Sequence, residues 1–248
     1  MILAAGLGAR LRPLTDDRPK ALVEIAGRTL LEITLSRLRS FGVREVIINV
    51  HHRAEMIVEY LKKNDNFGMG IEVSREEILL DTGGGLTKAA YFFLRDPAEQ
   101  PFIVHNVDVI STIDLGRMVQ FHTESQALAT LAVQDREASR YLLFDQEHRL
   151  CGRRAARDSK PELVRSSESE SEKVQALAFS GIHVISPRFL GMMIEEGVFS
   201  IISAYLRLAG QNEKIVAFRV DEYYWRDLGK PENVKQAARD LEQKVLVQ

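Results

Sequence analysis

The sequence predicts an α/β fold with a Rossmann-like, mixed but mainly parallel sheet that is flanked by helices. Over residues 1–133, short apolar runs of strand length alternate with segments whose apolar residues have helical spacing. This alternation is typical of a parallel sheet covered by helices. In addition, glycine clusters follow apolar runs near residues 6–8 and 83–85. Glycine-rich turns of this kind lead the chain out of a strand and into the next element.

The elements of the first half follow from apolar spacing and from end signals. A buried strand is expected at the start of the chain. Thr29 is suited to cap a helix that ends near Phe41 and Gly42. The β-branched run at 43–50 predicts a central parallel strand. The other expected segments are helices at 54–63, 86–93 and 115–123, and strands at 71–74, 101–105 and 127–133.

Beyond Asp135 the regular alternation ends. Strands are expected at 141–144, 176–185 and 215–220, and helices at 189–194 and 200–208. The polar stretch 158–173 contains a Ser/Glu-rich run at 166–172, which is typical of a surface loop. Pro231 suits the first turn of a terminal helix that reaches about residue 244.

Composition limits the possible functions. Hydrophobic residues make up 45% and charged residues 27% of the 248 positions, as in ordinary globular proteins. The 33 basic and 35 acidic side chains leave a net charge of −2, which argues against a general nucleic-acid binder. Cys151 is the single cysteine, so an intrachain disulfide is impossible. No apolar run has the length of a membrane span and no signal peptide is evident, so we expect a cytoplasmic protein that does not bind membranes.

The first twenty residues are the strongest candidate for a binding site. Gly6 and Gly8 follow the first apolar run and interrupt any helical periodicity. Because glycine has no Cβ, its backbone N–H groups can approach a phosphate closely. Four basic residues follow in the same loop: Arg10, Arg12, Arg18 and Lys20. We therefore expect a nucleoside triphosphate site here.

Two common glycine motifs do not account for this loop. A P-loop requires Gly-Lys-Ser/Thr, which does not occur in the chain. A dinucleotide-binding fingerprint requires a third glycine where this chain has Leu11. The pattern that is present is Gly6-Leu7-Gly8-Ala9-Arg10, followed by Pro19-Lys20.

That pattern closely resembles the signature of the sugar-1-phosphate nucleotidylyltransferases, also called NDP-sugar pyrophosphorylases. Four further stretches resemble motifs of this family in the same order along most of the chain: Asp81-Thr82-Gly83-Gly84-Gly85, Asn106-Val107-Asp108, Phe179-Ser180-Gly181-Ile182-His183 and Trp225-Arg226-Asp227-Leu228-Gly229. Among the branches, the chain looks most like the N-acetylmuramate-1-phosphate uridylyltransferase and mannose-1-phosphate guanylyltransferase group.

The resemblance implies one nucleotidyltransferase domain over residues 1–248, of the nucleotide-diphospho-sugar transferase type and without a C-terminal β-helix. Residues 1–135 would be its nucleotide-binding half and residues 136–248 its sugar-binding half. The implied enzyme joins a nucleoside triphosphate and a sugar-1-phosphate with the help of Mg²⁺. Partners other than these substrates are not implied, and we expect a monomer or a homodimer.

The resemblance also implies residue roles. Arg10, Lys20, Asp108 and Asp227 would be the catalytic residues. Arg10 and Lys20 would hold phosphates, and Asp108 and Asp227 would bind Mg²⁺, which prefers carboxylate and phosphate oxygens. If the strands before the two aspartates are parallel neighbours, both carboxylates lie at the carboxyl edge of the sheet. The implied substrate-binding residues are Ala5, Gly6, Gly8, Thr82, Gly83, Gly84, Asn106 and Gly181.

Several alternatives remain open at this point. A cytidylyltransferase acting on phosphocholine or a similar phosphorylated alcohol would use the same phosphate loop. A regulatory subunit on the same fold is a non-enzymatic alternative, although such a subunit would be expected to lack one of the charged site residues. No motif decides whether the lysine that the family uses to contact the sugar phosphate corresponds to Lys160, to Lys173 or to neither. The motifs identify neither the base nor the sugar.

Overall fold

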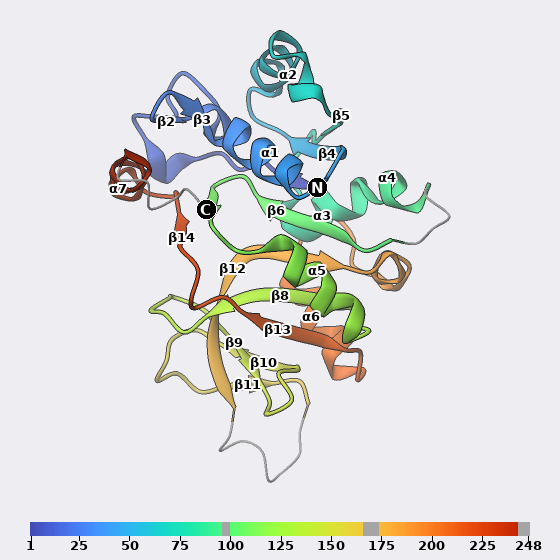
Figure 1. Cartoon of the computed structure of the whole chain (residues 1–248). Coiled ribbons are helices and arrows are strands. Elements are labelled where there is room, and N and C mark those ends of the chain that lie inside the picture. The colour runs from blue at the N-terminus through green and yellow to red at the C-terminus, as the bar shows by residue number, and fades with distance from the viewer. Residues whose placement is uncertain (96–99, 166–173, 243–248) are drawn as a thin grey trace. The chain divides into compact units, whose positions relative to one another are not determined.

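The computed structural model describes residues 1–95, 100–165 and 174–242 (Figure 1). The chain forms two compact units, each built from separate stretches of sequence. Unit 1 comprises Met1–Asp81, His105–Leu115 and the C-terminal stretch from Tyr223. Unit 2 comprises the described parts of Thr82–Val104 and Gly116–Glu222. The expectation of a single domain with halves that meet at residue 135 stays a prediction.

Unit 1 contains the parallel ladder that the alternating pattern predicts. Its strands are β1 (Ile2–Leu3), β4 (Glu45–Val50), β5 (Gly70–Arg75) and the last residues of β6 (Phe102–Asn106). β1 lies between β4 and β6, and β5 pairs with the other edge of β4; all three pairings are parallel. β4 is buried from its second residue onwards, as expected for a central strand that is covered on both faces.

Helices and a small hairpin complete unit 1. Thr29 accepts a hydrogen bond from the Glu32 N–H and caps α1 (Leu30–Ser40), as predicted. The other helices are α2 (Ala54–Lys63) and α7 (Pro231–Glu242), with 3₁₀ turns η1 (Ala9–Leu11), η2 (Lys20–Leu22) and η3 (Asp65–Gly68). A hairpin of β2 (Glu24–Ile25) and β3 (Arg28–Thr29) precedes α1 and was not predicted.

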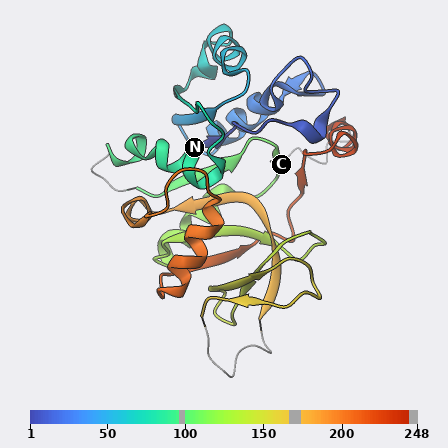
Figure 2. The same cartoon turned by 180° about the vertical axis from the view of Figure 1, so that it is seen from behind.

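Unit 2 is built around a sheet in which most pairings are antiparallel. Its strands are β8 (Ala129–Gln134), β9 (Tyr141–Phe144), β10 (Leu150–Arg154), β11 (Glu162–Leu163), β12 (Gln175–Ile185) and β13 (Ile215–Arg219). β8 pairs with β13 in parallel and with β12 in antiparallel fashion. α5 (Leu115–Glu124) lies in front of this sheet in Figure 1, and α6 (Ile201–Gly210) covers the opposite face, as Figure 2 shows.

The predicted α/β fold, with a mixed sheet and helical layers, is therefore confirmed. Some local predictions are wrong. The polar region after residue 144 contains β10 and β11, which were missed because their sequences are only partly apolar. The helix expected at 189–194 is a 3₁₀ helix, η4 (Pro187–Met192). The Ser/Glu-rich run at 166–172 lies outside the described residues. In the described part of the chain, no helix has the length and hydropathy needed to cross a membrane.

The second glycine cluster is also different from the prediction. It does not form a loop before a helix at 86–93; instead it lies inside α3 (Asp81–Lys88), which is followed by the short helix α4 (Ala90–Leu94). Gly83 packs against the ring of Phe199, and a Cβ at Gly83 would lie 2.2 Å from Cε2 of that ring. A tertiary contact thus explains a glycine in a helix, where its intrinsic propensity is poor.

Candidate active site

The first glycine loop turns sharply where the chain leaves β1. Gly8 has a φ of +67°, in the left-handed region that favours glycine. Its carbonyl accepts hydrogen bonds from the Leu11 N–H at 2.8 Å and from Thr15 Oγ1 at 2.9 Å. A Cβ at Gly8 would lie 2.9 Å from Thr15 Cγ2 and 3.2 Å from Lys20 Cβ. The glycine therefore lets the two ends of the loop close on one another and brings Lys20 to the turn.

Lys20 and Asp108 form the central ion pair of unit 1. Lys20 is the first residue of η2, directly after Pro19, and its Nζ donates to Asp108 Oδ2. The side chains are only 11% and 16% exposed, so the pair is largely removed from bulk water. A partly buried pair interacts more strongly than an exposed one, because less water screens the charges. The structure thus joins the predicted loop lysine to the predicted first aspartate.

Asp227 lies beside Asp108 through an antiparallel ribbon. β7 (Val109–Ser111) starts directly after Asp108, and β14 (Trp225–Asp227) pairs with it so that Asp227 faces Val109. The Leu228 N–H donates to the Asp108 carbonyl at 2.8 Å, which extends the pairing. The two aspartates are therefore not brought together by parallel neighbouring strands, the arrangement considered from the sequence. A two-stranded ribbon between residues far apart in sequence brings the backbone of Asp227 next to that of Asp108.

Gly229 connects Asp227 with Arg10. The Gly229 N–H donates to Asp227 Oδ1 at 2.8 Å. A Cβ at Gly229 would lie 2.7 Å from that carboxylate oxygen and 2.9 Å from Arg10 Nη2. The exposed Arg10 guanidinium and the half-buried Asp227 carboxylate thus both contact this glycine. Our sequence-based prediction missed Gly229, although its position two residues after Asp227 was a usable signal.

The C-terminal helix holds the strand that ends in Asp227. Asn233 of α7 donates to the Asp227 carbonyl at 2.7 Å. Asp240, also on α7, accepts from the Tyr224 hydroxyl at 2.6 Å and pairs with Arg226 at 3.1 Å. Burial together with this hydrogen bond to Asp240 raises the pKa of Tyr224 to about 12, so the hydroxyl remains a donor at neutral pH. α7 therefore holds the chain at Asp227 and at the residues just before it.

Asn106 ends β6 and lies beside a neutral histidine. His105 is 1% exposed, and burial lowers its pKa to about 4. The ring is therefore neutral at pH 7, and its Nδ1 lies 2.8 Å from the Asn106 carbonyl, to which it donates.

In the described residues, no three His, Cys, Asp or Glu side chains are grouped so that they alone could hold a metal ion.

Three of the implied substrate-binding residues, Thr82, Gly83 and Gly84, lie close together in unit 2. The Gly83 and Gly84 N–H groups donate to the Phe199 carbonyl at 2.9 and 3.4 Å. Thr82 Oγ1 accepts from the Ile201 N–H at 3.0 Å, at the start of α6. These donors and this acceptor thus already have protein partners. Contact between these residues and a substrate stays a prediction.

Gly181 occupies a bulge in β12. Phe179 pairs with Val133 and His183 with Leu131, so residues 180–182 of β12 stand opposite residue 132 of β8. Gly181 has a φ of +76°, which the bulge requires and which glycine adopts readily. Arg136 Nη2 donates to the Phe179 carbonyl at 2.9 Å, just before the bulge. Bulges often occur near active sites, where they redirect the strand.

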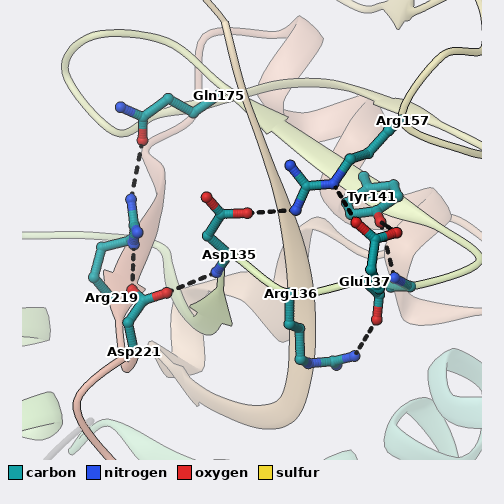
Figure 3. Close-up of polar contacts among 9 residues, drawn as sticks. Asp135, Arg136, Glu137, Tyr141, Arg157, Gln175, Arg219 and Asp221 are labelled. Carbon is teal, nitrogen blue, oxygen red and sulfur yellow. Dashed lines mark hydrogen bonds and ion pairs between the residues drawn. The ribbon is translucent and has the colours of Figure 1, made fainter.

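Charged residues surround the end of β8 next to this bulge (Figure 3). Asp221 Oδ1 accepts from the Asp135 N–H at 2.7 Å and its other oxygen accepts from Arg219 at 2.6 Å. Arg157 pairs with both Asp135 and Glu137, and the hydrogen bond to Asp135 raises the pKa of Arg157. The network therefore fixes the segment that contains Arg136.

The structure does not decide between the two candidate sugar-phosphate lysines. Lys160 is exposed, and Lys173 lies outside the described residues. Among the predicted site residues, those in unit 1 are Ala5, Gly6, Gly8, Arg10, Lys20, Asn106, Asp108 and Asp227, and those in unit 2 are Thr82, Gly83, Gly84 and Gly181.

Comparison with proteins of known sequence assigns the chain to a family. Residues 1–244 match the family described as "Nucleotidyl transferase". An N-acetylmuramate alpha-1-phosphate uridylyltransferase from Caulobacter vibrioides is 32% identical and is matched over 94% of this chain and 92% of its own length. A mannose-1-phosphate guanyltransferase from Yarrowia lipolytica is 30% identical over 94% of this chain. The chain spans only 61% of the length of that relative.

Solved structures show the same fold. A UDP-glucose pyrophosphorylase complexed with UDP-glucose superposes with a TM-score of 0.75 at 17% identity, over 98% of this chain and 97% of its own. HddC from Yersinia pseudotuberculosis superposes with a TM-score of 0.74 at 22% identity, over 97% of each chain. With the family match over residues 1–244, these findings show that the chain belongs to the nucleotidyl transferase family.

Proposed function

We propose that the chain transfers a nucleotidyl group from a nucleoside triphosphate to a sugar-1-phosphate and releases pyrophosphate. An oxygen of the sugar phosphate forms a bond to the α-phosphorus, while the bond from that phosphorus to the oxygen leading to the β-phosphate breaks. Both reactants are anions that must meet in line, so the protein neutralises charge and positions the groups. The observation that supports this most is the arrangement of Lys20, Asp108 and Asp227 beside the first glycine loop in unit 1.

Different residues of the first loop bind different phosphate groups. The exposed Arg10 guanidinium and the N–H groups of the glycine loop bind the β- and γ-phosphates. Lys20, which pairs with Asp108 here, donates instead to the α-phosphate or to the incoming sugar phosphate when substrates bind. The positive charges lower the repulsion between the two anions as they approach.

Asp108 and Asp227 fit a Mg²⁺ ion. Both are carboxylates, the ligand type that this hard cation prefers. Within the described residues, one oxygen of each carboxylate has a protein donor, namely Lys20 for Asp108 and Gly229 for Asp227. Two carboxylates without a third protein ligand suit Mg²⁺, which completes its shell with water and substrate phosphates. When bound, the ion would supply further neutralisation of phosphate charge.

The names of the relatives suggest which substrates to test first. The uridylyltransferase relative matches this chain over almost its whole length, whereas the guanyltransferase relative is much longer. We therefore propose UTP with N-acetylmuramate α-1-phosphate as the first pair and GTP with mannose-1-phosphate as the second. That the protein acts in the cytoplasm, as a monomer or a homodimer, stays a prediction.

Pyrophosphate release tests the function. The protein is incubated with Mg²⁺, each nucleoside triphosphate and a panel of sugar-1-phosphates, and we expect release with at least one pair. Asp108→Asn should abolish most of that turnover without unfolding the protein. Asp65→Asn is a matched control, because Asp65 is exposed in η3 and has a positive φ that asparagine tolerates. Folded wild-type protein that releases no pyrophosphate with any pair would rule out the proposal.

A further inference from the structure

A buried polar pair in unit 1, Asn49 and Glu76, connects the start of the first glycine loop with the segment that precedes α3. Asn49 is 3% and Glu76 5% exposed. Asn49 Nδ2 donates to Glu76 Oε1 at 2.6 Å. Buried polar side chains destabilise a protein unless they are hydrogen-bonded, so this pair needs its partners. None of the roles described above uses it.

The partners of the pair are backbone groups of two separate segments. Asn49 Oδ1 accepts from the Ala4 N–H at 2.8 Å, at the residue where the chain leaves β1 and enters the glycine loop. Glu76 Oε2 accepts from the Leu80 N–H at 3.0 Å, one residue before α3 begins. The pair therefore forms one continuous line of hydrogen bonds from Ala4 to Leu80.

The pair is itself held in place by the sheet. Asn49 stands opposite Leu3 in the parallel ladder of β4 with β1. The Glu76 N–H donates to the Val50 carbonyl at 2.8 Å, and the Glu76 carbonyl lies 2.9 Å from His51 Nδ1. Because Glu76 is fixed through its backbone on both sides, its carboxylate is a rigid anchor for Asn49 and, through Asn49, for the start of the loop.

We propose that Asn49 and Glu76 are positioning residues for triphosphate binding: they fix the backbone of the loop that starts at Ala4 so that its N–H groups point at the phosphates. This inference rests on the proposed function. It goes beyond it by assigning an effect on nucleotide affinity to a buried pair that lies outside the predicted site residues. Supporting residues of this kind can control the geometry of a site as strongly as the groups that contact the ligand.

The hydrogen-bond pattern allows a swap experiment. In Glu76→Gln, one carboxylate oxygen becomes an NH₂ that faces either the Asn49 amide or the Leu80 N–H. In Asn49→Asp, the new carboxylate oxygen faces Glu76, and the two negative charges repel. In the double variant the roles are exchanged: the new carboxylate at position 49 accepts from Ala4 and from the new amide at position 76, while the oxygen of that amide accepts from Leu80. Every donor then has an acceptor again.

The measurement is the Kd of UTP and of GTP by titration calorimetry, with unfolding midpoints recorded for each variant. We expect each single variant to bind the triphosphate that wild type binds about tenfold more weakly, and the double variant to recover most of that loss. Amide hydrogen exchange of residues 4–11 should be faster in the single variants and return towards wild type in the double variant. Wild-type pyrophosphate release reports on the proposed function separately.

A matched control distinguishes positioning from general destabilisation. Thr130→Val removes a buried hydrogen bond of 2.9 Å to His122 in unit 2 and should lower the unfolding midpoint without changing triphosphate affinity. Single variants at Asn49 and Glu76 that lose stability but keep wild-type Kd values would overturn the inference. So would a double variant that binds no better than the weaker single variant.

Discussion

Replacing Gly229 by alanine tests the geometry that joins Arg10 to Asp227. The new Cβ would lie 2.7 Å from Asp227 Oδ1 and 2.9 Å from Arg10 Nη2. Since non-bonded heavy atoms pack at about 3.5–4.0 Å, the two side chains must move apart by roughly 0.5–1 Å. A misplacement of about 1 Å can lower a rate by about 10²-fold, equivalent to ~2.7 kcal/mol of lost transition-state stabilisation. We therefore expect kcat/KM for pyrophosphate release to fall by one to two orders of magnitude.

Gly191→Ala is the control for this experiment. A Cβ at Gly191 in η4 would have no heavy atom within 4 Å, so the same chemical change should leave the rate unaltered. Both variants are assayed for steady-state pyrophosphate release and for thermal unfolding. If Gly229→Ala keeps the wild-type kcat/KM while folded, Arg10 and Asp227 do not act together at this position. Equal losses in both variants would refute the reasoning from local packing.

Three further predictions address unit 2. Gly83→Ala should lower the free energy of unfolding by about 1–3 kcal/mol in urea titrations, because the new Cβ overlaps the Phe199 ring; a loss near zero would contradict this packing. Burial lowers the pKa of His122 to about 4, so the unfolded state binds a proton at higher pH than the folded state; stability should fall as pH drops from about 6.5 towards 4, and His122→Gln should weaken that dependence in unfolding experiments. Arg136→Lys, which replaces the donor to the Phe179 carbonyl, should raise KM for the sugar-1-phosphate several-fold while KM for the triphosphate stays constant; equal changes in both KM values would argue against a role at the Gly181 bulge.

Much of the candidate site could be read from short motifs, because each motif contains its own chemical signal. Glycine next to basic residues indicated a phosphate loop, and the resemblance of Asp108 and Asp227 to family motifs indicated a metal site. Two supporting residues had no such signal. Asn49 and Glu76 act through contacts with residues distant in sequence, and nothing in their local sequence distinguishes them from ordinary turn or strand residues. Gly229 did have a signal, because it follows Asp227 by two residues, but no role was assigned to it from the sequence.

The sequence by itself determined the elements whose residues specify their own conformation. The β-branched run that forms β4, the capped helix α1 and the amphipathic helix α2 all lie where their patterns predict, because local propensity and burial favour the same structure. Only the tertiary structure showed that the second glycine cluster lies in a helix, and that Gly83 is needed there because Phe199 occupies the space that a side chain at this position would take. It also decided how Asp227 reaches Asp108, because a ribbon between β7 and β14 depends on residues more than a hundred positions apart, and no local pattern encodes that pairing.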